Sequence, residues 1–279
     1  MRSNSIQVEP VGSAVGAMIE GIDLTAPLGE PEVALIRETL FDRGVVFFHG
    51  QSLTPEQHIA FAEQFGPINV NRFFAHAEGY PAIAEVRKEP GQKKNIGGGW
   101  HTDHSYDQAP AMGSVLLAVE TPPSGGDTLF ADMYAAYEAL SDGLKETLSG
   151  LKAFHASEHI YGVEGVYGKT DQAHLAGHAE NPSAVHPVVI THPGSGRKAL
   201  YVNPGFTLAF EGWSREESLP LLGYLFQHAV KPQFVHRFQW KPGSMAIWDN
   251  RATWHCAMND YHGQRRLMHR ITIAGGPLH

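Results

Sequence analysis

The C-terminal segment 266–275 constrains the fold more than any other part of the chain. Its sequence, RLMHRITIAG, alternates in hydrophobicity and predicts a β-strand. The two-residue period of a strand places Arg266 and Arg270 on the same face. Burying two arginines on a strand that is otherwise rich in apolar residues is costly unless anions meet them. The segment therefore predicts an anion-binding strand, and structural ion pairs with Asp249 or Asp260 are the alternative.

Histidine and carboxylate residues add a candidate metal site to these arginines. His255 precedes the arginine strand, and the triplet His101-Thr102-Asp103 lies far upstream. Two histidines and one carboxylate are the ligand set of a facial-triad non-haem Fe(II) site, which leaves coordination positions open for a chelating cosubstrate and O₂. The arginines would then offer fixed cations for carboxylates near the metal.

The His-x-Asp/Glu spacing does not identify the ligands by itself. With 17 His and 29 acidic residues in 279 positions, chance predicts roughly two such triplets. Three occur, beginning at His76, His101 and His178. The first runs into a turn with Gly79 and Pro81 and predicts a loop, and the third lies in a polar stretch without apolar periodicity.

The sequence around His101 favours the second triplet. It follows three glycines and Trp100 and leads into the apolar run 115–119, which predicts a buried strand. In extended backbone, residues i and i+2 point to the same side, so His101 and Asp103 can converge on one ion while Thr102 faces away. For this triplet alone, a hydrogen-bonded surface pair remains the alternative.

Composition and charge exclude several classes of function. The formal net charge is −8 without a basic block, so nucleic-acid binding is not expected. The N-terminus lacks the apolar region of a signal peptide, and no stretch reaches membrane-spanning length, so no membrane association is expected. The single cysteine, Cys256, fits a reducing cytoplasm. It faces away from His255 on the predicted strand, which predicts a packed core thiol rather than a ligand.

The other periodic segments predict helices mixed with short strands. Helices are expected at 32–44, 58–66, 131–140 and 216–230, with N-terminal caps at Thr54, Asp132 and Ser214. Strands are expected at 45–48, 115–119, 245–250 and 252–257. There is no regular βαβ alternation and no G-x-G-x-x-G loop. This predicts an α+β, mainly β fold: a double-sheet jelly roll of the cupin type with flanking helices.

The segment 155–186 is rich in Gly and His and predicts a mobile lid over the site. His155 and His159 are four residues apart, a spacing that would suit zinc on a helix. The glycines at positions 162, 165 and 168 argue against a helix there.

Several longer motifs carry a family resemblance along nearly the whole chain. In order, they are WHTD, PSGGDTLF, AAYEALS, THPGSGRKALYVNPGF, AIWDNRATWH and QRRLMHRITIAG. With these motifs the chain resembles the TauD/TfdA family of Fe(II)- and 2-oxoglutarate-dependent dioxygenases. The resemblance implies one domain over residues 1–279 with a double-stranded β-helix core. It also implies oxidative decarboxylation of 2-oxoglutarate to succinate and CO₂, coupled to hydroxylation of a small organic substrate.

The resemblance also implies roles for individual residues. His101, Asp103 and His255 would be the iron ligands. Thr128 and Arg266 would bind the cosubstrate, whose far carboxylate needs a planar, bidentate cation such as Arg. Arg270 would receive the anionic head of the prime substrate, and Trp248 would lie beside the iron pocket.

The substrate contacts depart from those of taurine-using members of the family. Those members have His and Tyr where this chain has Asn71 and Phe74, and an Asn that falls here within the glycines 97–99. Asn71, Phe74 and His104 are predicted as the further substrate contacts. We therefore expect a small anionic substrate other than taurine, such as another sulfonate, a sulfate ester or an aryloxy or alkyl carboxylate.

Two other classes of function remain open at the level of sequence. One is a cupin-like metal-dependent hydrolase or isomerase, and the other is a non-catalytic binding protein on the same scaffold. Family members are often dimers or tetramers, so the resemblance implies a homo-oligomer.

Overall fold

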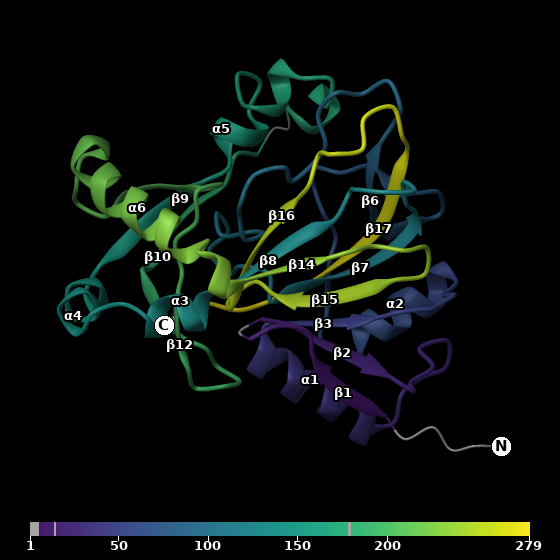
Figure 1. Cartoon of the computed structure of the whole chain (residues 1–279). Helices are drawn as coiled ribbons and strands as arrows, with labels where there is room; N and C mark the ends of the chain where they lie inside the picture. Colours follow the sequence, from purple (N-terminus) through teal and green to yellow (C-terminus); the bar gives the residue numbers. More distant parts are fainter. Residues whose placement is uncertain (1–5, 14, 178–179) are drawn as a thin grey trace.

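The computed structural model describes residues 6–13, 15–177 and 180–279, and a nine-stranded sheet is its largest element. The strand order is β1-β2-β3-β15-β7-β17-β6-β5, with β4 paired to β17 (Figure 1). The pairs are antiparallel except β2 with β3. The strands are β1 (Gln7–Pro10), β2 (Ala17–Glu20), β3 (Val45–Phe48), β4 (Ile68–Asn69), β5 (His76–Ala77), β6 (Tyr80–Lys88), β7 (Gly113–Glu120), β15 (Met245–Asp249) and β17 (Arg266–Ile273).

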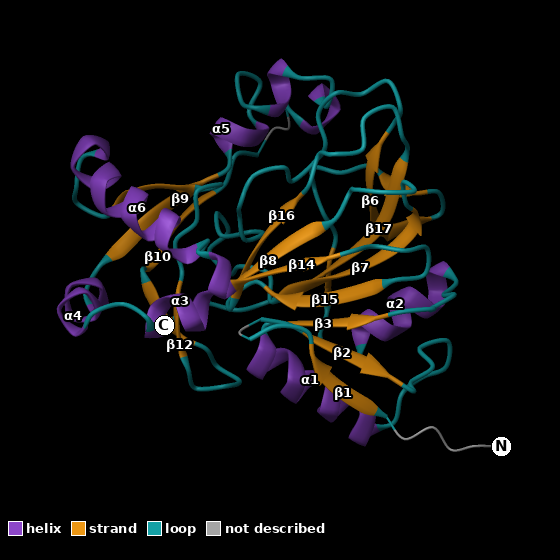
Figure 2. Ribbon diagram, in the orientation of Figure 1, coloured by secondary structure: helices purple, strands orange, loops and turns teal. Residues whose placement is uncertain are grey.

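A second, smaller sheet faces the first and completes the jelly roll. Its antiparallel order is β14-β8-β16, formed by Val235–Phe238, Thr128–Asp132 and Thr253–Ala257. Side chains of both sheets interdigitate in one buried cluster that includes Phe47, Phe130, Trp248 and Met268. The predicted double-stranded β-helix fold is thereby confirmed, with both sheets visible in orange in Figure 2.

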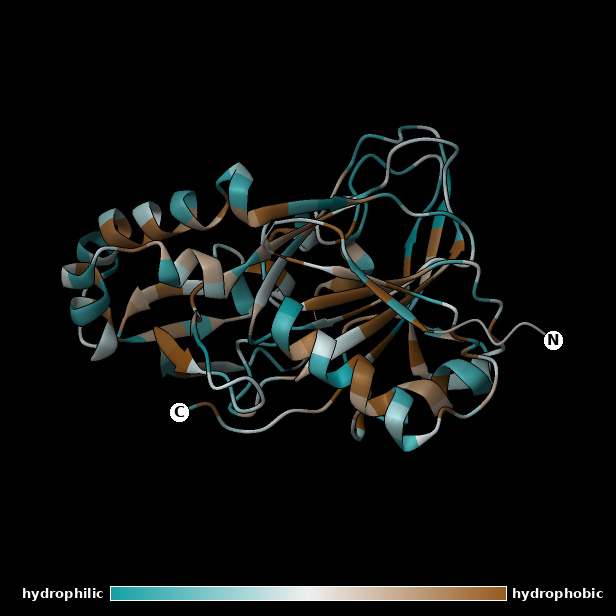
Figure 3. Cartoon of the chain, turned by 60° about the horizontal axis from the view of Figure 1, so that its bottom comes forward, coloured by the Kyte–Doolittle hydropathy of each residue, from teal (hydrophilic) through white to brown (hydrophobic). Residues whose placement is uncertain are grey.

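Two helices cover the outer face of the large sheet. Helix α1 (Glu30–Arg43) and helix α2 (Pro55–Glu63) lie beside β2 and β3 in Figure 1. Each presents an apolar side to the sheet, so hydrophobic and hydrophilic positions alternate along them (Figure 3). Ile36 and Leu40 of α1 and Phe61 of α2 are buried in one cluster with Ile247 and Ile271 of the sheet.

A third layer extends the molecule on the side of the small sheet. It contains the antiparallel sheet β10-β9-β13 and the pair β11-β12. Its strands are β9 (Lys152–Ala156), β10 (Ser183–Pro187), β11 (Val189–Thr191), β12 (Lys198–Leu200) and β13 (Thr207–Phe210). Its helices are α3 (Met133–Glu138), α4 (Asp142–Ser149), α6 (Arg215–Ala229) and the short η3 (Pro232–Phe234). They share one apolar cluster with the back of β16 through Trp254.

The predicted elements agree with the structure at most positions. The expected caps are present, since Thr54, Asp132 and Ser214 each accept hydrogen bonds from backbone N–H groups of the helix that follows. Gly44 ends α1 at φ 73°, a left-handed conformation that glycine adopts without strain. The expected loop at His76 is instead the two-residue strand β5, which pairs with β6.

The described part of the segment 155–186 contains regular secondary structure. It starts on β9 and ends on β10, and between them lie α5 (Glu158–Tyr161), η1 (Tyr167–Lys169) and η2 (Ala173–Leu175). The expectation that glycines prevent a helix is wrong for one turn, because α5 ends just before Gly162. In the part of the chain that the structure describes, no helix is long and apolar enough to cross a membrane.

Candidate functional site

The three predicted metal ligands meet between the two sheets. His101 forms an isolated antiparallel bridge with His255 of β16, through backbone hydrogen bonds of 3.1 and 2.8 Å. One ligand atom from each of His101, Asp103 and His255 lies within 4.8 Å of the others. The Nε2 atoms of His101 and His255 lie 3.6 and 3.8 Å from Asp103 oxygens. As expected, Thr102 points elsewhere and donates to the backbone oxygen of Asn250 at 2.7 Å.

The loops around the triplet fix the orientation of His101. Its Nδ1 lies 2.7 Å from the backbone oxygen of Gly99, so Nδ1 carries the proton and the Nε2 lone pair is free. Gly205 allows the close approach behind it, because a Cβ atom there would lie 2.7 Å from the Cβ atom of His101. Phe206 packs edge-on against the His101 ring at a centroid distance of 6.2 Å.

Burial and charge keep His255 and Asp103 in the protonation states that metals require. Burial lowers the pKa of His255 to about 3, so the imidazole is neutral near pH 7. Burial alone would raise the pKa of Asp103, but the neighbouring groups, above all the charge of Arg270, outweigh it and hold that pKa well below its usual range. A neutral imidazole and an ionised carboxylate are the ligand forms. Two imidazoles and one carboxylate whose ligand atoms converge within 4.8 Å fit a divalent transition metal.

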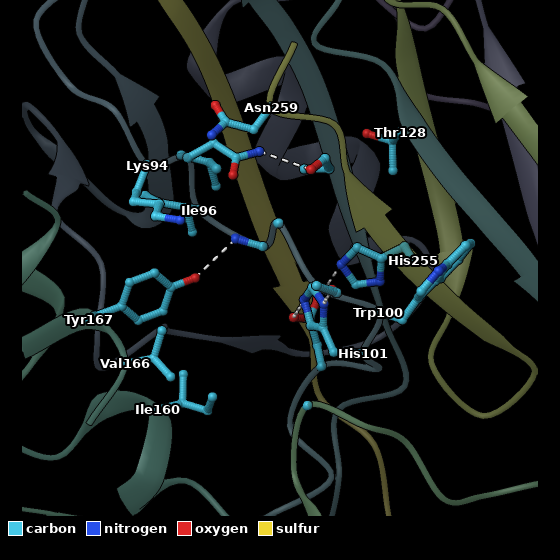
Figure 4. A pocket seen from close by; sticks show the side chains of 18 of the residues that line it. Lys94, Ile96, Trp100, His101, Thr128, Ile160, Val166, Tyr167, His255 and Asn259 are labelled. Atoms are coloured by element: carbon cyan, nitrogen blue, oxygen red, sulfur yellow. Dashed lines mark hydrogen bonds and ion pairs between the residues drawn. The ribbon is translucent and has the colours of Figure 1, made fainter. Parts of the chain in front are cut away.

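The ligands lie in a cavity of about 590 Å³, which we call the central cavity (Figure 4). Its floor is formed by the two sheets and the 95–101 loop, and residues from 160–170 form another wall. Thr128 lies on one side of His101 and His255 in Figure 4, and Val166 and Tyr167 lie on the other. The metal ligands, Thr128 and the residues of the segment 160–170 thus line one cavity.

Arg266 is a buried cation without an anionic partner in the described structure. It is 4% exposed, and its Nε and Nη2 atoms have no hydrogen-bond partner. Its guanidinium lies 5.9 Å from the ring of Trp240, and burial lowers its pKa. The alternative of an ion pair with Asp260 is wrong, because Asp260 pairs with Arg237. An unpaired buried arginine at a cavity wall favours the presence of an anion there.

Arg270 lies next to the metal ligands on the same face of β17. Its Nη1 donates to the two carboxylate oxygens of Asp103 at 3.3 and 3.4 Å. The guanidinium stacks 4.5 Å from the centre of the Phe74 ring, and its Nε has no hydrogen-bond partner. The alternative ion pair with Asp249 is wrong as well, because Asp249 pairs with Arg251 and His192. Arg270 thus links the metal ligand to the cavity that Phe74 lines.

Two tryptophans pack against residues of the site. The indole N–H of Trp240 donates to the Thr128 hydroxyl at 2.9 Å, and Thr128 lines the central cavity. Trp248 also lines the cavity, and its ring lies 4.7 Å from that of His255. The sequence predicted Thr128 and Trp248 but not Trp240, whose motif FQWKPGS offers no local chemical signal.

Two predicted substrate contacts lie outside the central cavity. Asn71 is buried, and its side-chain oxygen accepts hydrogen bonds from the backbone N–H groups of Phe73 and Phe74. His104 bonds through Nδ1 to Asp107 at 2.8 Å and adopts φ 60°, which places it in the left-handed region. Neither residue lines the cavity, so the structure brings only Phe74 of these three to the site.

The other histidine and cysteine candidates lie apart from the ligands. His76 is exposed on β5, and the triplet that begins at His178 includes positions 178 and 179, which lie outside the described residues. Cys256 is a buried thiol, and burial raises its pKa to about 11. Among the described residues, the only group of three or more His, Cys, Asp or Glu side chains placed to hold a metal is the one at His101.

Several cavity residues were not predicted as site residues from sequence. They are Lys94, Asn95, Ile96, Trp100, Ile160, Val166, Tyr167, Thr170, Phe206 and Asn259. Most come from loops, where neither periodicity nor a motif indicates the direction of a side chain. Phe206 was contained in the quoted motif VNPGF but was not singled out.

Comparisons with known proteins agree with this geometry. The model of the "Taurine catabolism dioxygenase TauD, TfdA family" matches residues 7–272. An alpha-ketoglutarate-dependent 2,4-dichlorophenoxyacetate dioxygenase from Cupriavidus pinatubonensis is 36% identical over 96% of this chain and 97% of its own length. An alpha-ketoglutarate-dependent sulfate ester dioxygenase from Pseudomonas putida is 34% identical over 97% of this chain and 90% of its own length.

A solved structure of a dioxygenase is also similar to this chain. The crystal structure of a taurine dioxygenase from Burkholderia xenovorans superimposes with a TM-score of 0.83 at 36% identity, covering 98% of this chain and 92% of the other. These similarities favour a dioxygenase over the alternatives of a hydrolase, an isomerase or a non-catalytic binding protein. The chain belongs to the TauD/TfdA family and is a 2-oxoglutarate-dependent dioxygenase.

Proposed function

We propose that the protein hydroxylates a small anionic organic substrate at an iron held by His101, Asp103 and His255. The observation that carries the proposal is the juxtaposition of these three ligands with two arginines on one strand face. When bound, Fe(II) supplies the chemistry by which O₂ converts 2-oxoglutarate to succinate and CO₂ and places one oxygen atom on a substrate carbon.

Arg266 and Thr128 are proposed to bind the far carboxylate of 2-oxoglutarate. The guanidinium offers unpartnered Nε and Nη2 donors, and its planar shape matches a carboxylate. Trp240 donates its N–H to the Thr128 oxygen, which leaves the hydroxyl hydrogen free to donate to an anion. The buried setting strengthens both interactions, because little water competes there.

Arg270 is proposed to bind the anionic head of the prime substrate. Its Nε is buried without a partner, and the Phe74 ring holds the guanidinium plane at the cavity wall. The same side chain donates to Asp103, so it also orients that carboxylate. Apolar walls at Leu116 and Phe206 would limit water near the reacting carbon.

The names of the relatives support an anionic substrate. One relative acts on 2,4-dichlorophenoxyacetate, a carboxylate, and another acts on a sulfate ester. Both groups are anions that a guanidinium binds well. We propose a substrate of this class, namely a sulfonate, a sulfate ester or an aryloxy or alkyl carboxylate.

The segment between β9 and β10 is proposed to act as a lid within a single domain. Ile160, Val166 and Tyr167 come from this segment and line the central cavity. A lid that opens for substrate entry would expose this wall to solvent. Assembly into a dimer or tetramer stays a prediction.

Succinate formation tests the proposed function. We expect succinate from 2-oxoglutarate to require both Fe(II) and O₂, and to be stimulated by anionic substrates more than by matched neutral ones. Asp103→Ala should abolish it while the far-ultraviolet circular dichroism stays unchanged. Equal stimulation by matched neutral compounds would overturn the proposed substrate class, and an active Asp103→Ala variant would overturn the ligand assignment.

A further inference from the structure

The central cavity contains a cation that the proposed function does not use. The Lys94 side chain lines the cavity on the same side as Ile96 and Tyr167 and away from Thr128 (Figure 4). Within the described ranges, the charged side chains of the lining are Lys94, Arg266, Arg270 and Asp103. No ion pair joins Lys94 to any residue that the structure describes.

The backbone at Lys94 is held firmly by three side chains. Asp171 accepts hydrogen bonds from the N–H groups of Lys93 and Lys94, the latter at 3.2 Å. Gln172 donates to the backbone oxygen of Lys94 at 2.9 Å, and Asn259 donates to that of Lys93 at 2.9 Å. The exposed Lys94 side chain therefore extends from a fixed point of the backbone at the cavity wall.

Most other polar groups on this wall already have partners. The Tyr167 hydroxyl accepts from the Gly97 N–H at 2.9 Å, and the Asn95 amide donates to the Ala257 oxygen at 2.9 Å. Thr170 donates to the Tyr167 backbone oxygen at 3.1 Å. Beside these groups, the wall is apolar at positions such as Ile160.

The lining of the central cavity carries more positive than negative charge, which favours a substrate with more than one anionic group. Three cations against the carboxylate of Asp103 leave an excess of two positive charges on the lining. A divalent metal ion and the dianionic cosubstrate cancel each other. A substrate with one anionic group bound at Arg270 would leave the exposed Lys94 at the cavity wall without an anionic partner.

We propose that Lys94 forms a second anion subsite and that the prime substrate is a dianion. One anionic group binds near Arg270, the second binds at Lys94, and an apolar segment of the substrate joins them along the cavity wall that includes Ile96. This inference rests on the proposed function, and it narrows the substrate class from anions to organic dianions.

Equilibrium binding tests the subsite without turnover. The full-length protein, loaded with Fe(II) and 2-oxoglutarate in the absence of O₂, is titrated with alkane disulfonates of increasing length and with monosulfonates of the same lengths. We expect one length of disulfonate to bind about fivefold more tightly than its monosulfonate, the size of an exposed charge pair. Lys94→Gln should remove that difference, and Lys94→Arg should retain it.

Lys93 provides the matched control, since it is an exposed neighbour that does not line the cavity. Lys93→Gln should leave the preference for the disulfonate intact. Equal affinity for mono- and disulfonates at every length, equal effects of Lys93→Gln and Lys94→Gln, or no binding of any probe would each overturn the inference. The proposed function fails separately, by the absence of Fe(II)- and O₂-dependent succinate formation with every anion.

Discussion

Replacing Arg266 by Met separates a binding role of this arginine from a structural one. Methionine keeps an unbranched apolar chain of similar reach and removes the guanidinium. In the wild-type protein the guanidinium is 4% exposed, and its Nε and Nη2 atoms have no partner. Its removal should therefore weaken cosubstrate binding while the protein without cosubstrate remains stable.

Arg266→Met should weaken the binding of 2-oxoglutarate strongly but should not lower the stability of the protein without cosubstrate. Loss of a buried, charge-assisted pair with the 2-oxoglutarate carboxylate should cost about 3 kcal/mol, or about 100-fold in Kd. In the absence of cosubstrate, Arg266→Met relieves the desolvation of an unpaired cation and loses the contact with Trp240 at 5.9 Å. Since the cation–π contact contributes only about 1 kcal/mol and an unpaired buried charge costs more, the free energy of unfolding should stay equal or rise.

Urea unfolding with and without 2-oxoglutarate measures both effects in one experiment. At a cosubstrate concentration 100 times the wild-type Kd, binding should add about 2.7 kcal/mol to the wild-type free energy of unfolding and only about 0.4 kcal/mol to that of the variant. Arg265→Met is the control, because the neighbouring Arg265 forms surface ion pairs with Glu89 and Glu120. It should leave the cosubstrate effect unchanged and cost under about 1 kcal/mol.

The opposite pattern would refute the reasoning. If Arg266→Met destabilised the protein without cosubstrate by several kcal/mol, while 2-oxoglutarate stabilised it as much as the wild type, Arg266 would be a structural residue. The same conclusion would follow if Arg265→Met weakened cosubstrate binding as strongly as Arg266→Met.

Two further predictions follow from the buried polar groups. Trp240→Phe removes the 2.9 Å hydrogen bond to Thr128. In steady-state succinate assays it should raise the KM for 2-oxoglutarate about fivefold with little change in kcat. An unchanged KM would show that Trp240 does not contribute to the cosubstrate site. Burial lowers the pKa of His58 to about 3 from 6.5, so the unfolded state binds more protons between these values and stability falls as the pH drops through that window. His58→Leu should therefore reduce the loss of unfolding free energy between pH 7 and pH 5 by about 2 kcal/mol. The control His262→Gln changes an exposed histidine and should leave that loss unchanged. Urea titrations at both pH values measure the loss, and equal results for the two variants would show that the assignment to His58 is wrong.

The sequence by itself determined the elements whose signal is periodic or short-range. The alternation of polar and apolar residues predicted strand β17. Because side chains alternate between the two faces of any strand, it also placed Arg266 and Arg270 on the same face. The caps at Thr54 and Ser214 followed from residues three positions apart. The metal triplet at His101 followed from context, because two other triplets in the chain share its spacing.

The tertiary structure alone decided which of these groups share a site. Arg270 contacts Asp103 across 167 positions of the chain, and Trp240 contacts Thr128 across 112. Neither pairing has a local signal, because sheet register and the packing of two sheets bring these residues together. The same reason explains why Asn71 lies outside the cavity and Lys94 lines it, since the direction of a loop side chain depends on contacts with distant segments. The local pattern thus determined the chemistry that the chain carries, and the packing determined its geometry.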